Sequence, residues 1–307
     1  MKVKISARLQ RMVISALYQS MDVQLMERLA GRVVRDYDLH ARTGIPDHIA
    51  INQVDAATVI YEDMLDAGLL RPFVEILVEV DGDGTMDRKR PIKFLPEIVK
   101  EIEAFGYKFS KEYGVFIEDE AQRRTKGWGV LRNGIDYEFS FLRLDIVGNT
   151  KLVRKYPERV ISEAYADVKR IVATSVEKRQ GRIWHWEGDG GYAAFYFGAK
   201  NAHSTVTGME VLLELIVYNR FECALEEPLA VRMAVHTGPC QFQSDDKRVQ
   251  GSSLDRLHEI ESDYTEANSL TISPGVYTDL GHKLGEFFEP FETADHSLLY
   301  RYRVSFV

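Results

Sequence analysis

Two aspartates of this 307-residue chain stand where apolar strand-like runs give way to glycine. Asp145 ends an apolar run that begins at Phe139, and Asp189 lies in a glycine-flanked turn. A side chain at a strand end beside a tight turn leaves the core but stays rigidly aimed. Hard divalent cations bind carboxylate oxygens. If the strands are neighbours, the two carboxylates predict a cation site, although singly Asp145 could be a helix N-cap and Asp189 a turn residue.

The segment that follows Asp145 has the residue types of a phosphate-binding turn. Glycine permits close approach of an anion, and backbone N–H groups at a helix start can donate to it. A helix is expected from Leu152 to Arg179, with side-chain donors from the residues just before it. The residues predicted to bind phosphate are Val147, Gly148, Asn149, Thr150 and Lys151.

Three stretches resemble the signature stretches of class III nucleotidyl cyclases, in that family's order. They are Leu144-Asp-Ile-Val-Gly-Asn-Thr-Lys-Leu, Glu187-Gly-Asp-Gly-Gly-Tyr-Ala-Ala-Phe and Met233-Ala-Val-His-Thr-Gly-Pro. The closing Leu298-Leu-Tyr-Arg-Tyr-Arg-Val resembles the family's last strand, so the resemblance covers about residues 135 to 305. It implies an α+β fold with a ferredoxin-like βαββαβ mixed sheet and helices.

The resemblance also implies a reaction and its cofactors. Asp145 and Asp189, helped by the backbone carbonyl of Ile146, would bind two Mg²⁺ or Mn²⁺ ions per site. The ions would activate the ribose 3′-hydroxyl of a nucleoside triphosphate and neutralise its phosphates, giving a 3′,5′-cyclic nucleotide and pyrophosphate. Two chains contribute to each site in this family, so a head-to-tail homodimer is expected.

The chain departs from the family at the positions that select the base and stabilise the transition state. His185 and Arg248 replace the residues that select a purine, and a histidine cannot reproduce the hydrogen bonds of lysine to adenine or glutamate to guanine. Asp255 and Glu259 occupy the positions of the Asn and Arg that stabilise the reacting phosphorus. Acidic groups there would repel developing negative charge, and Arg256 is one step out of register.

These departures leave three interpretations open. The retained carboxylates favour an enzyme, and the lost purine pair makes it similar to the pyrimidine cyclases of bacterial antiphage Pycsar systems, which would convert UTP or CTP to cUMP or cCMP. An adenylate cyclase with a rearranged pocket is the second interpretation. The third is a nucleotide-binding or dimerising module without turnover.

Composition limits the other classes of function. With 45% hydrophobic and 28% charged residues, the chain is typical of a globular protein and long enough for two domains. A net charge of −8 opposes general attraction to nucleic acid or anionic membrane, and no stretch has the ~20 apolar residues of a membrane span, so a cytoplasmic protein is expected. The two cysteines, Cys223 and Cys240, indicate neither a disulfide framework nor a zinc site.

The periodicity of apolar residues predicts how these parts are carried. Residues 1–80 are expected to form a helical bundle that loosely resembles death-like effector-associated domains and regulates the enzyme or recruits a partner. Residues 81–134 are expected to be a linker, and residues 135–307 the cyclase domain, with helices against one face of its sheet. Strand alternation predicts that Trp184 and Trp186 lie on the face opposite His185.

Overall fold

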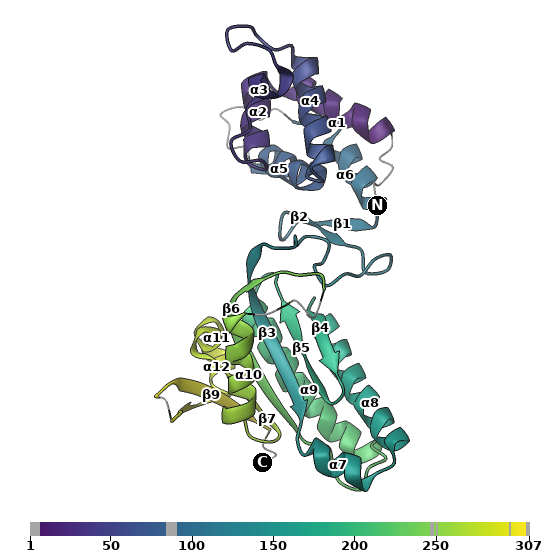
Figure 1. Cartoon of the computed structure of the whole chain (residues 1–307), viewed down its shortest axis with the longest axis vertical. Coiled ribbons are helices and arrows are strands. Elements are labelled where there is room, and N and C mark those ends of the chain that lie inside the picture. Colours follow the sequence, from purple (N-terminus) through teal and green to yellow (C-terminus); the bar gives the residue numbers. More distant parts are fainter. Residues whose placement is uncertain (1–6, 84–90, 246–248, 250, 295, 305–307) are drawn as a thin grey trace. The chain divides into compact units, whose positions relative to one another are not determined.

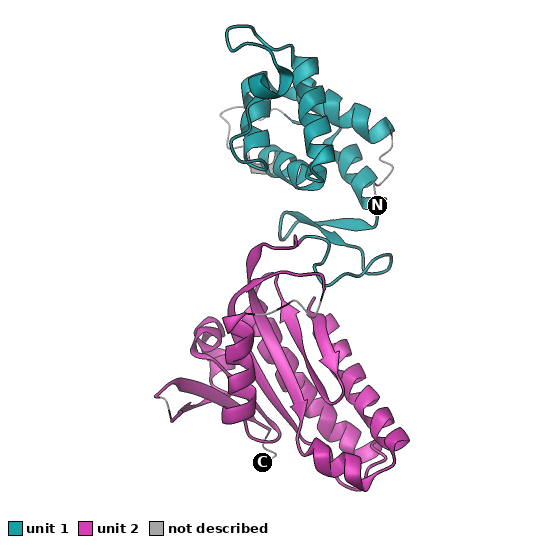
Figure 2. Ribbon diagram, viewed as in Figure 1, with its two compact units in different colours: residues 1–130 teal, residues 131–307 magenta. Residues whose placement is uncertain are grey.

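The chain folds into two compact units, residues 1–130 and residues 131–307 (Figure 2). The computed structural model describes residues 7–83, 91–245, 249, 251–294 and 296–304. Arg248, one of the two predicted base-selecting residues, lies outside the described residues.

The first unit is built from short amphipathic helices around one apolar core (Figure 1). Side chains of Asp22, Asp38 and Asn52 cap three of the helices by accepting a backbone N–H of the first turn. The described elements of this unit are α1 (Ala7–Ser20), α2 (Val23–Gly31), α3 (Leu39–Thr43), α4 (Gln53–Asp66), α5 (Leu70–Asp83), α6 (Leu95–Glu103), β1 (Tyr107–Ser110) and β2 (Val115–Glu118).

The segment 81–134, predicted to be a linker, is largely folded into this first unit. Ile98 and Ile102 of α6 and Phe116 of β2 belong to the unit's core. The N–H of Phe116 donates to Glu75 on α5 at 2.8 Å, which ties the β1–β2 hairpin to the helices. The boundary between the units therefore falls near residue 130, because this segment supplies core residues that its charged composition did not suggest.

The second unit contains a seven-stranded mixed sheet in the order β4-β5-β3-β6-β7-β9-β8. The pair β6–β7 is parallel and the other neighbours are antiparallel. The strands are β3 (Asp136–Ile146), β4 (Arg182–Glu187), β5 (Gly190–Phe195), β6 (Val231–Gln241), β7 (Ser269–Ile272), β8 (Glu289–Glu292) and β9 (Leu298–Arg303). The first four strands, with β3 between β5 and β6, have the ferredoxin-like arrangement, which confirms the predicted α+β class.

Whereas the sequence predicted helices on one face only, helices lie on both faces of this sheet. They are α7 (Asn149–Lys155), α8 (Glu158–Glu177), α9 (Lys200–Phe221), α10 (Ser252–Tyr264), α11 (Pro274–Asp279) and α12 (Gly281–Gly285). Leu142 and Leu144 of β3 share a core with α8 and α9 (Figure 1). The alternate residue Arg143 contacts Glu261 of α10 at 3.0 Å on the opposite face. The prediction was wrong because the polar side of β3 is covered by a helix that comes more than 100 residues later.

The single helix expected from Leu152 to Arg179 is two helices. α7 ends at Lys155, the backbone is extended at Tyr156, and α8 starts after Pro157. Proline disfavours helical backbone in the residue before it, which accounts for the break.

A β-bulge in β4 changes which side chains face the sheet's α10 side. The register shifts just before His185, so Trp184 and His185 lie on the same face. The ring of Trp184 packs 5.7 Å from Phe141, and the ring of His185 lies 5.9 Å from Tyr192, which also contacts Phe141. Trp186 packs on the other face. Only one of the two tryptophans therefore lies opposite His185, because the bulge interrupts the alternation.

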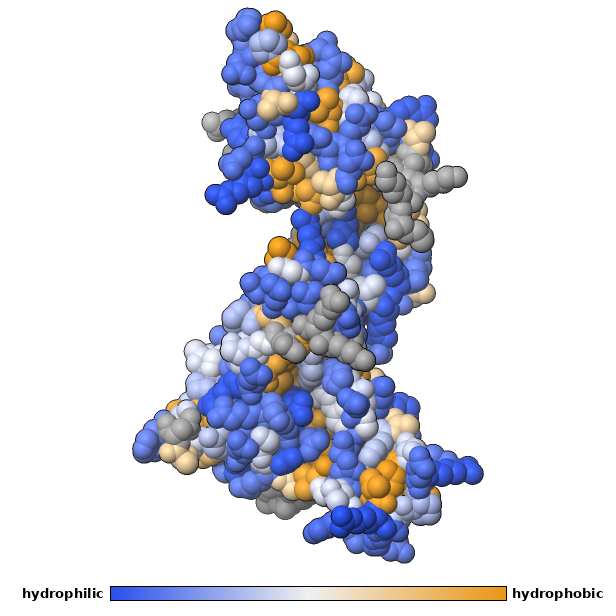
Figure 3. Space-filling view, in the orientation of Figure 1, coloured by the Kyte–Doolittle hydropathy of each residue, from blue (hydrophilic) through white to orange (hydrophobic). Residues whose placement is uncertain are grey.

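The visible surface is mostly hydrophilic, with apolar residues in scattered patches (Figure 3). Of the helices in the described part of the chain, none combines the length and the hydrophobicity that a bilayer crossing needs.

Candidate functional site

The fold brings the two aspartates to the same end of two paired strands. Asp145 pairs with Gly190 across β3 and β5, and Asp189 directly precedes Gly190 in the tight β4–β5 turn. The N–H of Ile146 donates to the carbonyl of Asp189 at 3.2 Å. Gly188 has a φ of +58°, a conformation that glycine adopts without strain and that suits a two-residue hairpin turn. The glycines seen in the sequence thus fold the hairpin that carries Asp189 to Asp145.

The carboxylate of Asp145 is held in one orientation. Its Oδ2 accepts a hydrogen bond from Nη2 of Arg232 at 2.9 Å. A Cβ atom added at Gly190 would lie 3.2 Å from Asp145 Oδ1 and 2.6 Å from the carbonyl oxygen of Leu144. Oδ2 of Asp145 therefore faces β6, and Oδ1 faces the hairpin that carries Asp189. Glycine at position 190 keeps this approach open.

Tyr165 on α8 lies close enough to both aspartates to sense their charge. Its hydroxyl donates to Asn149 Oδ1 at 2.7 Å. Burial, and then the negative charges of Asp189 and Asp145, raise the pKa of Tyr165, which keeps the phenol protonated. Tyr165 was missed in the sequence because it lies one helix away from Asn149 and carries no local motif.

The donor set fits a divalent cation that also has other ligands. The carboxylate of Asp189 has no hydrogen bond or ion pair among the described residues, and neither does Oδ1 of Asp145. The side chain of Ile146 is buried, so this residue offers only its backbone carbonyl. In the described ranges no group of three or more His, Cys, Asp or Glu is placed to hold a metal. Because Mg²⁺ takes six oxygen ligands, these few oxygens would suffice only with phosphates and water.

The turn after Asp145 exposes only part of the predicted phosphate-binding set. Gly148, at φ +76°, precedes α7, and Gly148, Thr150 and Lys151 are exposed. The amides of Gly148, Asn149 and Thr150 have no acceptor in the described part of the chain. The N–H of Val147 donates to the carbonyl of Ala230 at 2.8 Å and is not available. The helix α7 has only seven residues, so its dipole is small. A phosphate at this turn would be attracted mainly by these amides and by Lys151.

At the base-selecting position, His185 lies on the edge strand β4 with 39% of its side chain exposed. Its Nε2 is 3.6 Å from Glu187 Oε2, and its ring lies beside that of Tyr192. Tyr192 was not predicted, although its place three residues after Asp189 on the facing strand of the hairpin could have indicated it. The structure thus presents an imidazole and a phenol together.

The start of α10 is acidic, but one of its acids is neutralised. Asp255 is exposed in the first turn of the helix. Arg256 forms an ion pair with Glu259 at 2.7 Å, and its guanidinium lies 5.9 Å from the ring centre of Tyr264. Arg256 therefore has an ion-pair partner within its own helix.

His236 on β6 has a structural role. Burial, and then the positive charge of Arg256, lower the pKa of His236 to about 4, so the imidazole is neutral near pH 7. Its Nδ1 is hydrogen-bonded with Ser273 Oγ at 3.0 Å. The imidazole is therefore a neutral, hydrogen-bonded group of the fold.

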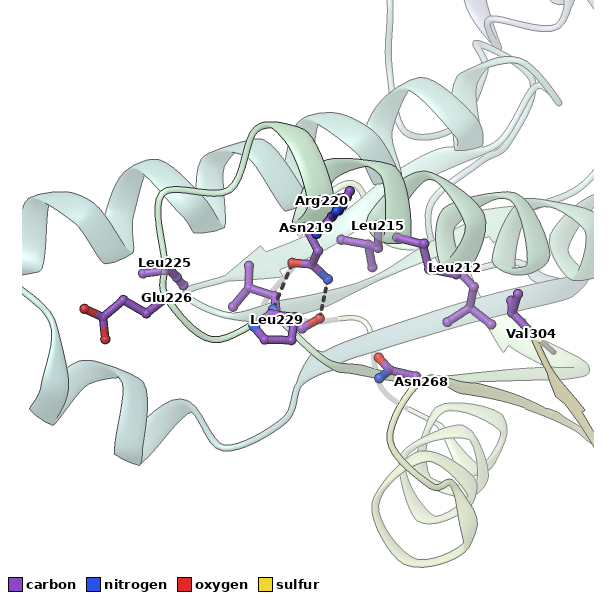
Figure 4. A pocket seen from close by; sticks show the side chains of 11 residues that line it. Leu212, Leu215, Asn219, Arg220, Leu225, Glu226, Leu229, Asn268 and Val304 are labelled. Atoms are coloured by element: carbon purple, nitrogen blue, oxygen red, sulfur yellow. Dashed lines mark hydrogen bonds between the residues drawn. The ribbon is translucent and has the colours of Figure 1, made fainter. Parts of the chain in front are cut away.

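A separate pocket lies among α9, the α9–β6 loop and the strand ends (Figure 4). It has a volume of 580 Å³, and neither aspartate lines it. Asn219 uses both ends of its amide on the backbone of Leu229, at 2.8 and 2.9 Å. The lining of the pocket is mostly apolar and contains one cation, Arg220, and one acid, Glu226, so the pocket has little net charge to attract a triphosphate.

Comparison with known proteins gives similarity only at the level of structure. No protein-family model matches the sequence, and no curated protein matches it. The adenylyl cyclase CyaB from P. aeruginosa is 18% identical, over 57% of this chain and 98% of that chain, with a TM-score of 0.49. The guanylyl cyclase Cya2 is 19% identical, over 55% of this chain and 93% of that chain, with a TM-score of 0.48. The catalytic core of a rhodopsin-guanylyl cyclase with converted specificity, in complex with ATPαS, is 13% identical. The match covers 56% of this chain and 98% of that chain, with a TM-score of 0.48.

Proposed function

We propose that this protein is a nucleotidyl cyclase that converts a nucleoside triphosphate to its 3′,5′-cyclic monophosphate and pyrophosphate. The observation that carries the proposal is the pairing of Asp145 with the residue next to Asp189, beside a glycine turn with open amides. Carboxylates next to free N–H donors suit a triphosphate with its cations. The sequence resemblance to class III cyclases points to the same residues.

In this proposal each group of the chain has a defined task. Asp145 and Asp189 would hold two Mg²⁺ or Mn²⁺ ions, which lower the pKa of the ribose 3′-hydroxyl and neutralise the phosphates when bound. The amides of residues 148–150 and Lys151 would receive the β- and γ-phosphates. The 3′-oxygen attacks the α-phosphorus, its proton leaves to solvent, and the bond from the α-phosphorus to the bridging oxygen breaks to release pyrophosphate.

We infer that the preferred base is a pyrimidine, so the substrate would be UTP or CTP. His185 cannot donate to adenine as a lysine does, or accept two hydrogen bonds from guanine as a glutamate does. His185 and Tyr192 together leave aromatic surface at this position. An adenylate cyclase with a rearranged pocket would be the alternative within the same chemistry.

A head-to-tail homodimer and a signalling role are parts of the same proposal. The resemblance to class III cyclases implies that two copies complete each site. The helical unit would regulate that dimer or recruit a partner. Its loose resemblance to death-like effector-associated domains suggests a second messenger for antiphage defence.

A second function, nucleotide binding without turnover, is favoured by one specific observation. Asp255 is exposed at the start of α10 and has no ion pair with another described residue, and negative charge there would oppose the transition state. Such a module would bind a triphosphate with metal and would release no pyrophosphate.

Product analysis separates these functions. The full chain is incubated with Mn²⁺ and each of the four ribonucleoside triphosphates, and mass spectrometry identifies the products. The expected result is a cyclic product from one pyrimidine nucleotide. Metal-dependent nucleotide binding without any product would support the binding module, and a cyclic purine product would overturn the base assignment.

A further inference from the structure

Glu261 on α10 is a buried acid that bridges two arginines. Only 1% of its side chain is exposed. Its Oε2 lies 3.0 Å from Nε of Arg143 on β3, and its Oε1 lies 3.0 Å from Nε of Arg232 on β6. A buried carboxylate is destabilising unless it is paired, and the two arginines provide such pairs.

Arg232 connects Glu261 to the candidate metal ligand. Its Nη2 donates to Asp145 Oδ2 at 2.9 Å, and its Nη1 donates to the carbonyl of Ser262 at 3.2 Å. Its Nε lies 3.0 Å from Oε1 of Glu261 without hydrogen-bond geometry, so this contact is an ion pair, and the two hydrogen bonds orient the guanidinium. The planar guanidinium is therefore fixed, and it fixes Asp145 in turn.

The charges of this network decide how strongly the site attracts a cation. Asp145, Asp189 and Glu261 contribute three negative charges, and Arg143 and Arg232 contribute two positive charges, which leaves one net negative charge. Without the charge of Glu261 the sum would be zero. Arg143 would then lose its carboxylate partner, and Arg232 would be balanced by Asp145 alone, so the positive charge would oppose a cation at Asp145.

We propose that Glu261 is a positioning residue for the metal-binding carboxylate of Asp145, acting through Arg232 while neutralising Arg143. This inference rests on the proposed function. Arg232 keeps Oδ2 toward β6, and the other oxygen of Asp145 is left toward Asp189 for the cation. Groups that orient a metal ligand in this way typically change metal affinity by about 10–100-fold when they are removed.

The test measures cation binding directly, so it does not depend on turnover. Mn²⁺ is titrated into the full chain in the presence of inorganic pyrophosphate, and free Mn²⁺ is followed by electron paramagnetic resonance. Glu261→Gln should weaken Mn²⁺ binding by about 10–100-fold. The matched control is Glu118→Gln in the first unit, since Glu118 is equally buried, with 0% of its side chain exposed, and is paired with Arg123 at 2.9 Å. The control should leave Mn²⁺ affinity unchanged.

A double variant separates charge from packing and protects against misfolding. Glu261→Gln combined with Arg143→Met restores one net negative charge and removes the unpaired guanidinium. It should regain most of the lost affinity and melt at a higher temperature than Glu261→Gln alone. The proposal is overturned if Glu261→Gln binds Mn²⁺ like the wild type while Asp145→Ala does not, or if the double variant recovers no affinity. If Asp145→Ala binds Mn²⁺ as the wild type does, or if the wild type binds no Mn²⁺, both this proposal and the proposed function fail.

Discussion

The two sides of the candidate site differ in how far their residues match the class III cyclase pattern. On the β3 and hairpin side, Asp145, Gly148 and Asp189 keep the residue types that hold cations and phosphates. On the α10 side, Asp255 and Glu259 occupy the positions at which the resemblance to class III cyclases implies an Asn and an Arg. Binding of a metal–triphosphate complex and acceleration of its reaction are separate demands. In the proposed cyclase the retained carboxylates would meet the first demand, and the second would have to be met by other groups.

The largest effect is expected on the retained side. Asp145→Asn and Asp189→Asn keep the side-chain size but remove the charge. Each should lower cyclase activity by at least about 100-fold, which is more than the loss typical for a residue that only orients a metal ligand. Initial rates of pyrophosphate release measure the loss. Asp263→Asn, at an exposed acid of α10, is the control and should have normal rates. Wild-type rates in either active-site variant would show that the carboxylates hold no catalytic cation.

The altered side gives the next test. Asp255→Asn with Glu259→Arg restores the family's residue types, and a donor aimed at developing charge is typically worth about 10²–10³-fold in kcat. A rise in kcat with little change in KM is therefore expected. No rise would mean that another group already stabilises the transition state or that the helix does not face the substrate.

Base preference should respond more weakly. His185→Lys should shift the ratio of kcat/KM values toward ATP, and His185→Glu toward GTP, by about tenfold, because each side chain restores hydrogen bonds to a purine. Competition between the four nucleotides, read by mass spectrometry, measures the shift. If neither variant alters the profile, base selection lies on other residues.

A smaller effect is expected from the contact between α8 and the turn. Tyr165→Phe removes the hydrogen bond to Asn149, worth about 1 kcal/mol, and should raise KM for the triphosphate about fivefold. Tyr218→Phe on α9 removes a comparable bond to Asp167 on α8 and serves as the control. Equal KM values in both variants would argue against a role for Tyr165 in placing the turn.

The smallest effect concerns His236 beneath α10. Because its pKa in the folded protein, about 4, lies below the ordinary value near 6.5, its contribution to stability is present above pH 6.5 and is lost as the pH falls through 4. The melting temperature of the wild type should fall more than that of His236→Gln over this range. Parallel pH profiles would show that the imidazole does not titrate as described.

Much of the site could be predicted because its residues are close in the sequence. Asp189 lies between glycines in a short hairpin, and the residues after Asp145 continue its strand directly into a turn. Errors arose where a local rule was interrupted. Pro157 divided the expected long helix, and the bulge before His185 moved Trp184 to the same face as His185. The segment 81–134 looked like a linker because its core residues are few and contact helices far back along the chain.

The sequence by itself determined the chemical types in the site and the local turns that carry them, because glycine and strand alternation act over a few residues. The tertiary structure alone decided which charges meet. Arg232 on β6 reaches Asp145 on the neighbouring strand β3, and Glu261 reaches Arg143 and Arg232 from α10. These residues are far apart in the chain and become neighbours only when strands pair and α10 covers the sheet. No local pattern encodes such contacts, since the electrostatic interaction depends on distance in space and not on separation along the chain.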